Sequence, residues 1–137
     1  ALVIAKNWER VLAEATFKYA GSVYKDMGKV ETIIEAKGNA SKAMNAYIKH
    51  WGELKGFSLA LQTGKNNLGG TAAKLNRLIG FGPLMLDKNQ VVGINSQGNY
   101  VRSKGVSWKA YMDQMVSIQK LMISEFSVTA RNKDVTK

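Results

Sequence analysis

The chain has 137 residues, with 20 lysines and arginines, 10 aspartates and glutamates, one histidine, one proline and no cysteine. This length suits one domain with a single core and excludes a large multidomain enzyme. The absence of cysteine excludes disulfides, thiolate catalysis, iron–sulfur clusters and cysteine-ligated zinc. The net charge of +10 is unusual. It fits a solvated basic face, an acidic partner surface or a polyanion ligand.

The amino-terminal residues carry no clear targeting signal. Five apolar residues come first, and charged and polar residues follow from Lys6 onward. This run is too short for the core of a signal peptide or for a membrane span. The chain also lacks an initiator methionine, and two explanations stay open, a mature form and a fragment of a longer protein.

Two long helices are predicted in the first half. Apolar residues three and four apart predict a helix over residues 3–27, with Gly28 as its stop. Residues 30–37 are ambiguous, because their β-branched side chains favour a strand whereas their glutamates and alanine suit a short helix. The second long helix is predicted to begin at Asn39 or Ser41, either of which can cap it. Extra apolar residues, among them Leu59, predict that its end is deeply buried.

Gly52 and Gly56 lie one turn apart inside the second helix. A glycine tolerated inside a helix usually has a packing reason, so we expect another helix to approach closely here. Residues 64–70 form a loop by composition. This loop is not a phosphate-binding loop, because Lys65 follows the first glycine and a helix precedes the segment.

The second half predicts a short helix, a long connection and a last long helix. Thr71 is the expected cap of the short helix, which ends at Gly80. Residues 81–105 are irregular, and 90–94 can pair with 99–102 as a small hairpin. Ser107 is the expected cap of the last helix, over residues 108–126, and the polar residues 131–137 are expected to fray. The predicted fold class is therefore all-α, with residues 1–137 as a single helical domain: a bundle of three long helices and a short one.

His50 and Glu53 are the candidate metal-ligating residues. They lie three residues apart on the second helix and project from the same face. A histidine and a carboxylate at that spacing can share a divalent metal, as in helix-bundle carboxylate sites. They can equally form a structural hydrogen bond inside a helix interface. Because Tyr47 and Trp51 flank His50, we expect a largely buried ring with Glu53 as its partner, and we favour the structural hypothesis.

The same helix carries a family resemblance. Residues 46–62 include the run His50-Trp51-Gly52-Glu53-Leu54-Lys55-Gly56-Phe57 and resemble a helix of imelysin-like proteins, above all their uncharacterised relatives in the bacterial cell envelope. Residues 7–11 and 24–27 resemble the helix that precedes it there, so the resemblance extends over residues 7–85.

The resemblance implies an all-helical fold of paired bundles, a periplasmic or cell-surface setting and a neighbourhood of iron uptake. The family's Gly-x-His-x-x-Glu pattern, proposed as a functional or metal-associated site, is matched at His50 and Glu53, whereas Ile48 stands in place of the glycine. Characterised members are longer, so the chain would correspond to a C-terminal portion of such a domain. Its partner half would then be missing or supplied by another molecule.

Our leading hypothesis is a non-catalytic helical binding or assembly module of a bacterial envelope. Its expected partners are other protein chains, the missing part of a longer precursor or a second copy, with an acidic partner surface as one option. Trp51, Lys49 and Lys55 are candidate binding residues. We assign no catalytic residue, because the sequence has no Gly-x-Ser-x-Gly elbow and a single histidine.

Two alternatives remain open. The first is a metal-dependent peptidase centred on His50 and Glu53, with a divalent metal or iron as the candidate cofactor. A zinc hydrolase normally presents three protein ligands, which ranks this alternative lower. The second is a basic protein that binds nucleic acid or another polyanion. The aromatic residues fall mostly on apolar stripes, where core packing is expected rather than base stacking, so nucleic acid is disfavoured.

Overall fold

The structure is a computed structural model that describes residues 2–63 and 69–137, with side chains described from residue 7 onward. Its elements in chain order are α1 (Leu2–Glu35), α2 (Ser41–Thr63), α3 (Gly70–Ile79), β1 (Gln90–Ile94), β2 (Tyr100–Ser103) and α4 (Trp108–Phe126). The predicted helical fold is confirmed, with a small two-stranded sheet added. Most of the loop predicted over residues 64–70 lies outside the described residues.

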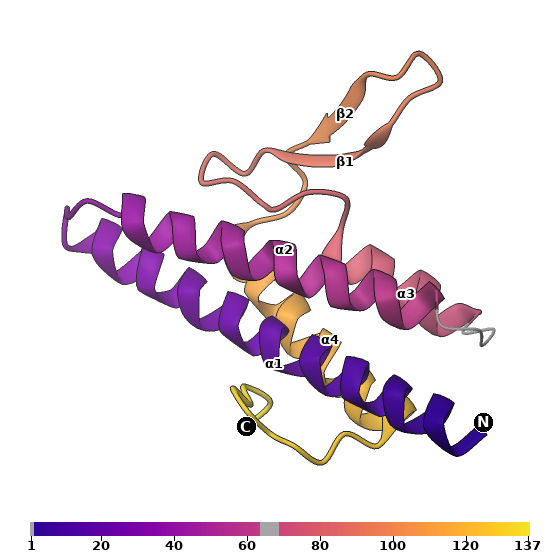
Figure 1. Cartoon of the computed structure of the whole chain (residues 1–137). Coiled ribbons are helices and arrows are strands. Elements are labelled where there is room, and N and C mark those ends of the chain that lie inside the picture. The colour runs from indigo at the N-terminus through magenta and orange to yellow at the C-terminus, as the bar shows by residue number, and fades with distance from the viewer. Residues whose placement is uncertain (1, 64–68) are drawn as a thin grey trace.

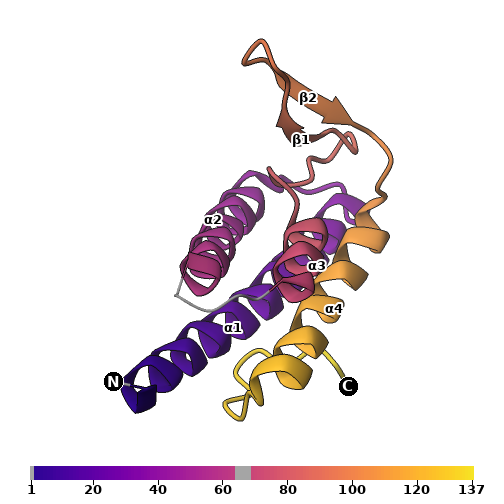
Figure 2. The same cartoon turned by 90° about the vertical axis from the view of Figure 1, so that its right-hand side faces the viewer.

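The helices form one packed body from which the hairpin projects. Helices α1 and α2 run side by side in opposite directions, and α4 crosses α1 (Figure 1). Helix α3 lies between α2 and α4, as the end-on view shows (Figure 2). The core between these helices is apolar, and its largest fully buried side chains are Tyr47, Tyr111, Phe17, Met27, Leu54, Leu61, Leu75, Ile79, Leu84, Met115, Ile118 and Met122.

Helix α1 is longer than predicted, because it continues through Gly28 to Glu35. The predicted stop at Gly28 is wrong, and so is the strand alternative for residues 30–37. The apolar stripe continues through Val30, which is fully buried, so packing outweighs the cost of a glycine inside the helix. The helix ends where Lys37 adopts a left-handed conformation with φ of 58° and the N–H of Gly38 donates to the carbonyl of Ile33.

Helix α2 corrects two expectations. Outside the neighbouring residues of α2 itself, a Cβ at Gly52 or Gly56 would meet no described atom within 4 Å, so no other described helix approaches closely there. The close approach is at Gly21 in α1, where a Cβ would lie 1.9 Å from the carbonyl oxygen of Lys133. The end of α2 is buried on one face only, since Leu61 is 2% exposed whereas Leu59 is 45% exposed.

The helix caps agree with the sequence in part. Ser107 accepts the N–H of Ala110 at 3.0 Å, which confirms the predicted cap of α4. The side chain of Asn39 accepts the N–H of Ser41 at 2.9 Å at the start of α2. The predicted cap at Thr71 is wrong, because α3 begins at Gly70 and Gly69 occupies the N-cap position, two residues before Thr71. The backbone at this position has φ of 48°, which glycine adopts without steric cost because it has no Cβ.

The predicted hairpin is confirmed, and it is fastened to the helices. Strands β1 and β2 pair antiparallel, with a register irregularity between Val91 and Gly93. The connection before β1 is held by the hydroxyl of Tyr47, which donates to the carbonyl of Leu84 at 2.8 Å. The side-chain amide of Gln90 donates to the carbonyl of Gly82 at 2.9 Å. Residues 80–90 therefore have a defined position against α2.

The C-terminal segment does not fray as predicted. Residues 128–137 turn back along α1 and α4 (Figure 1), and Val128 is only 2% exposed. In the described part of the chain, no helix combines the length and the apolar character that a membrane crossing requires.

Candidate functional site: a lysine-lined cleft around His50 and Asp26

A cleft of about 440 Å³ opens where α1, α2 and the C-terminal segment meet. One stripe of α1 supplies most of its lining, because the residues involved are spaced three and four apart and so share a face. The histidine of α2 and one lysine of the C-terminal segment complete it. The lining residues are Lys18, Tyr19, Ser22, Lys25, Asp26, Lys29, His50 and Lys133.

His50 is paired with Asp26 across the interface between α2 and α1. Its Nδ1 lies 2.5 Å from Oδ2 of Asp26, and the two side chains are 31% and 11% exposed. A short hydrogen bond to a carboxylate fixes the orientation of an imidazole ring. Because this contact uses Nδ1, Nε2 is the ring nitrogen left for a further partner.

Glu53 has a different partner from the one expected. A hydrogen bond with the carboxylate of Glu53 raises the pKa of the Tyr19 hydroxyl above its usual value. The ring of Tyr19 also stacks on Phe57, with centroids 5.4 Å apart. The expected pairing of His50 with Glu53 is thus replaced by His50 with Asp26 and Glu53 with Tyr19. His50 is partly buried rather than enclosed, since nearly a third of its side chain is exposed.

Of the predicted binding residues, Trp51 belongs to the core. It is 8% exposed, and its indole N–H donates to the hydroxyl of Tyr111 at 2.7 Å. That hydroxyl in turn donates to the carbonyl of Ile79 at 2.5 Å. Burial raises the pKa of Tyr111 above its usual value, so the hydroxyl keeps its proton for this bond. Trp51 therefore joins α2, α4 and the end of α3.

The two predicted lysines have separate positions. Lys49 is exposed on α2 and is not among the residues that line the cleft around His50. Lys55 lies further along α2, where its Nζ donates to the carbonyl of Gly80 at 2.8 Å. Partial burial lowers the pKa of Lys55 below its usual value. The structure brings neither lysine to His50.

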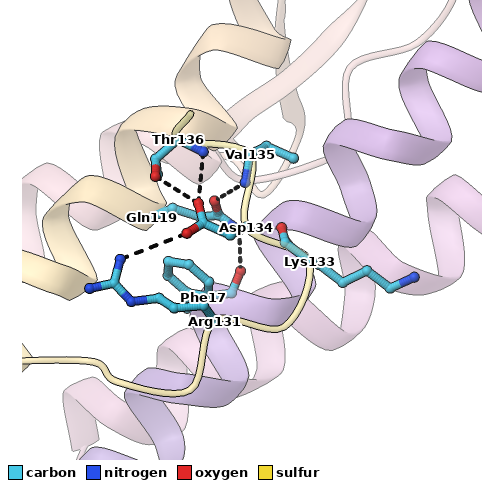
Figure 3. A network of polar contacts seen from close by, with 7 residues as sticks. All are labelled: Phe17, Gln119, Arg131, Lys133, Asp134, Val135 and Thr136. Carbon is cyan, nitrogen blue, oxygen red and sulfur yellow. Dashed lines mark hydrogen bonds and ion pairs between the residues drawn. The ribbon is translucent and has the colours of Figure 1, made fainter.

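The C-terminal segment is held against α1 by a buried amide (Figure 3). Gln119 of α4 is fully buried, and its Nε2 donates to the carbonyls of Phe17 and Lys133, both at 2.9 Å. Its Oε1 accepts the N–H of Val135 at 2.9 Å. All polar atoms of this side chain are thereby used, which fixes the backbone that carries Lys133 to the rim of the cleft.

A local turn completes this segment. The hydroxyl and the N–H of Thr136 both donate to Oδ1 of Asp134, at 2.6 and 2.8 Å. These bonds, led by the one from the hydroxyl, lower the pKa of Asp134 below its usual value. Arg131 lies 3.8 Å from the other carboxylate oxygen (Figure 3).

Sequence reasoning missed most of the cleft, although one signal was available. Lys18, Ser22, Lys25 and Lys29 follow steps of four, three and four, which is a polar stripe beside the apolar one. Asp26 and Lys133 could not be assigned in this way. Their contribution depends on how α2 and the C-terminal segment pack against α1.

The donor set fits a metal poorly. Among residues 7–63 and 69–137, no group of three or more histidines, cysteines or carboxylates could hold an ion. His50 uses Nδ1 for Asp26, and the carboxylate of Glu53 bonds to Tyr19. A catalytic zinc site needs three protein ligands, which these residues do not supply. What the cleft offers instead is positive charge.

No family model, curated protein or solved structure matches this chain. None of these comparisons supports the imelysin-like resemblance of residues 46–62, which stays a prediction from the sequence.

Proposed function

We propose that the chain is a non-catalytic helical binding module that takes an anionic group into the cleft around His50. One observation carries the proposal. Four lysines, Lys18, Lys25, Lys29 and Lys133, line this cleft together with a single carboxylate, and that carboxylate already pairs with His50. Clefts lined by one sign of charge concentrate ions of the opposite sign.

Further features support binding rather than catalysis. Lysines act as flexible point charges that attract phosphate or carboxylate groups. The hydroxyl of Ser22, on the same face of α1, is a further donor or acceptor at the cleft. The backbone N–H groups along this part of α1 serve the helix itself, so they supply no oxyanion hole.

The setting proposed for this module is the bacterial cell envelope, in the periplasm or at the cell surface. The argument for it is the imelysin-like resemblance of residues 46–62, which also suggests a link to iron or metal uptake. The anion would then be a group on a partner protein chain, on a second copy or on a small ligand of the envelope.

The test is calorimetric titration of the full chain with inorganic phosphate at low ionic strength. The double variant Lys25→Gln/Lys29→Gln removes two charges from the cleft and should weaken binding at least tenfold. Lys74→Gln/Lys120→Gln is the matched control, because it removes the same charge from a groove between α3 and α4. The control should bind phosphate like the parent, because Lys74 and Lys120 do not line the cleft around His50. Since both variants lose the same charge, a difference between them reports where the lysines lie.

The outcomes separate the proposal from its rivals. Absence of phosphate binding, or equal weakening in both variants, would contradict a site at the cleft. A larger loss of phosphate affinity in the control would indicate that the anion binds in the α3–α4 groove, which is lined by Lys74, Arg77 and Lys120. That result, with affinity for DNA falling steeply as salt rises, would favour the polyanion alternative.

A further inference from the structure

A second cleft, of about 750 Å³, lies on another side of the molecule. It is bounded by α2, by the end of α3 and by residues of the hairpin and of the connection that leads into it. Its lining includes four apolar side chains, and three of them, Leu59, Phe81 and Val92, are 45%, 45% and 47% exposed. Apolar side chains left half in water around one hollow are typical of a ligand-binding surface.

The walls of this second cleft are built by side chains that bind the end of α3. Lys55 of α2 donates to the carbonyl of Gly80, and Gln114 of α4 donates to that of Leu78 at 2.9 Å. Tyr111 donates to the carbonyl of Ile79 between them. Three successive carbonyls at this helix end are thus bound by side chains of α2 and α4, so the cleft is formed before any ligand arrives.

The hairpin side of the cleft is fixed as well. Gly80 has φ of 83°, and a Cβ there would lie 2.5 Å from Nε2 of Gln90. The side chain of Gln90 is itself buried and donates to the carbonyl of Gly82. Because the backbone passes so close to Gln90, the start of β1 is held against the end of α3. Phe81 and Val92 therefore line the cleft from a backbone whose position is held by these contacts.

The charges of this cleft have one sign. Lys55 and Arg77 line it, and no acidic residue is among its lining residues. Arg77 is exposed in the last turn of α3, and its planar guanidinium suits a carboxylate, sulfate or phosphate group. An apolar surface beside a cation with no competing carboxylate complements a molecule with an apolar body and an anionic head.

We propose that this second cleft binds an amphiphilic anion, with a hydrocarbon body against Leu59, Phe81 and Val92 and an anionic head at Arg77 and Lys55. The ligand class is that of a medium- or long-chain fatty acid. The site is separate from the cleft around His50, because the two share no lining residue. The proposal for the second cleft does not depend on whether an anion binds in the cleft around His50.

The test compares octanoate with 1-octanol, which has the same chain length and no charge, by calorimetric titration below the concentration at which octanoate forms micelles. Octanoate should bind at least tenfold more tightly than 1-octanol. Arg77→Gln should remove most of that preference, whereas Lys74→Gln, one turn earlier on α3 and outside this cleft, should preserve it. Lys25→Gln/Lys29→Gln should also bind octanoate like the parent.

The apolar half of the site has its own variants. Phe81→Ser should weaken the binding of octanoate and of 1-octanol at least fivefold. Leu86→Ser changes a residue of similar exposure outside this cleft and should weaken the binding of neither. Val92→Thr keeps the branched shape of an exposed strand residue, so it tests the same surface with little risk to folding. Amide chemical shifts at Gly80 and Val92 should move on titration.

Three results would overturn this proposal. The first is absence of octanoate binding, and the second is equal binding of octanoate and 1-octanol by the parent. The third is concentration-dependent self-association of the parent, measured by light scattering, that Phe81→Ser abolishes while octanoate does not compete. That third result would identify the occupant as a second copy of this chain.

Discussion

At the scale of single residues, the hydrogen-bond partners of the polar side chains in α2 are set by the opposing helix rather than by spacing along α2. His50 and Glu53 share a face, yet His50 pairs with Asp26 and Glu53 bonds to Tyr19. Both partners come from α1. A carboxylate on the opposing helix meets the ring directly, whereas two side chains on one helix lie parallel and one above the other.

His50→Ala should therefore lower the free energy of unfolding by about 1–3 kcal/mol, because it leaves the mostly buried carboxylate of Asp26 without its partner. Lys49→Ala, at the exposed neighbouring position, is the control and should stay within about 0.5 kcal/mol of the parent. Urea unfolding of both variants, with and without a chelator, measures the effect.

A double-mutant cycle with Asp26→Ala should give a coupling energy of about 1 kcal/mol or more for this pair. The opposite pattern would favour the metal hypothesis. His50→Ala would then unfold like the parent in chelator and lose a stabilisation that added metal gives to the parent.

At the scale of elements, the glycines of the helices differ in what they do. Gly28 lies inside α1, and its nearest contact for a Cβ is 3.9 Å away, so the helix simply tolerates it. Gly52 and Gly56 are exposed inside α2 with open space around them. The two glycines of α2 weaken the helix, and no close packing against the described residues compensates for this.

Gly52→Ala and Gly56→Ala should each raise the free energy of unfolding by about 0.5–1 kcal/mol, because alanine restricts the unfolded chain and favours the helix. Their effects should add only in part, since the two positions are one turn apart. Thermal and urea unfolding are the measurements. A loss of stability in either variant would contradict the open space at this face of α2.

At the scale of the whole molecule, the C-terminal segment links α1 to α4. The buried amide of Gln119 binds the carbonyl of Phe17 in α1 and the backbone of Lys133 and Val135 in the segment. This arrangement requires a residue without a side chain at Gly21, against which the carbonyl of Lys133 lies. The same contact brings Lys133 to the cleft around His50.

Gly21→Ala should displace the C-terminal segment, because a Cβ would collide with backbone and with Nε2 of Gln119, 2.6 Å away. The loss of partners for a buried amide should cost about 1–3 kcal/mol of stability. Trypsin should then cleave after Arg131 and Lys133 much faster than in the parent.

Gly28→Ala is the matched control on the same helix, because its Cβ would meet no described atom closer than 3.9 Å. It should leave the cleavage rate close to that of the parent and, like the alanines in α2, raise the free energy of unfolding by about 0.5–1 kcal/mol. Unchanged trypsin cleavage in Gly21→Ala would contradict the docked arrangement of the segment.

The sequence by itself determined the helical class, the last helix with its Ser107 cap and a hairpin that pairs residues 90–94 with 99–102, because apolar spacing, capping side chains and turn residues act locally. It also contained the lysine stripe of α1. Only the tertiary structure decided that α1 continues past Gly28, since the burial of Val30 against other elements outweighs a local stop signal. It likewise decided which carboxylate meets His50, that Gly21 rather than Gly52 is the close approach, and that residues 128–137 dock. These outcomes depend on contacts between residues as far apart in the sequence as Phe17 and Gln119. The free energy of such contacts cannot be read from a local sequence pattern.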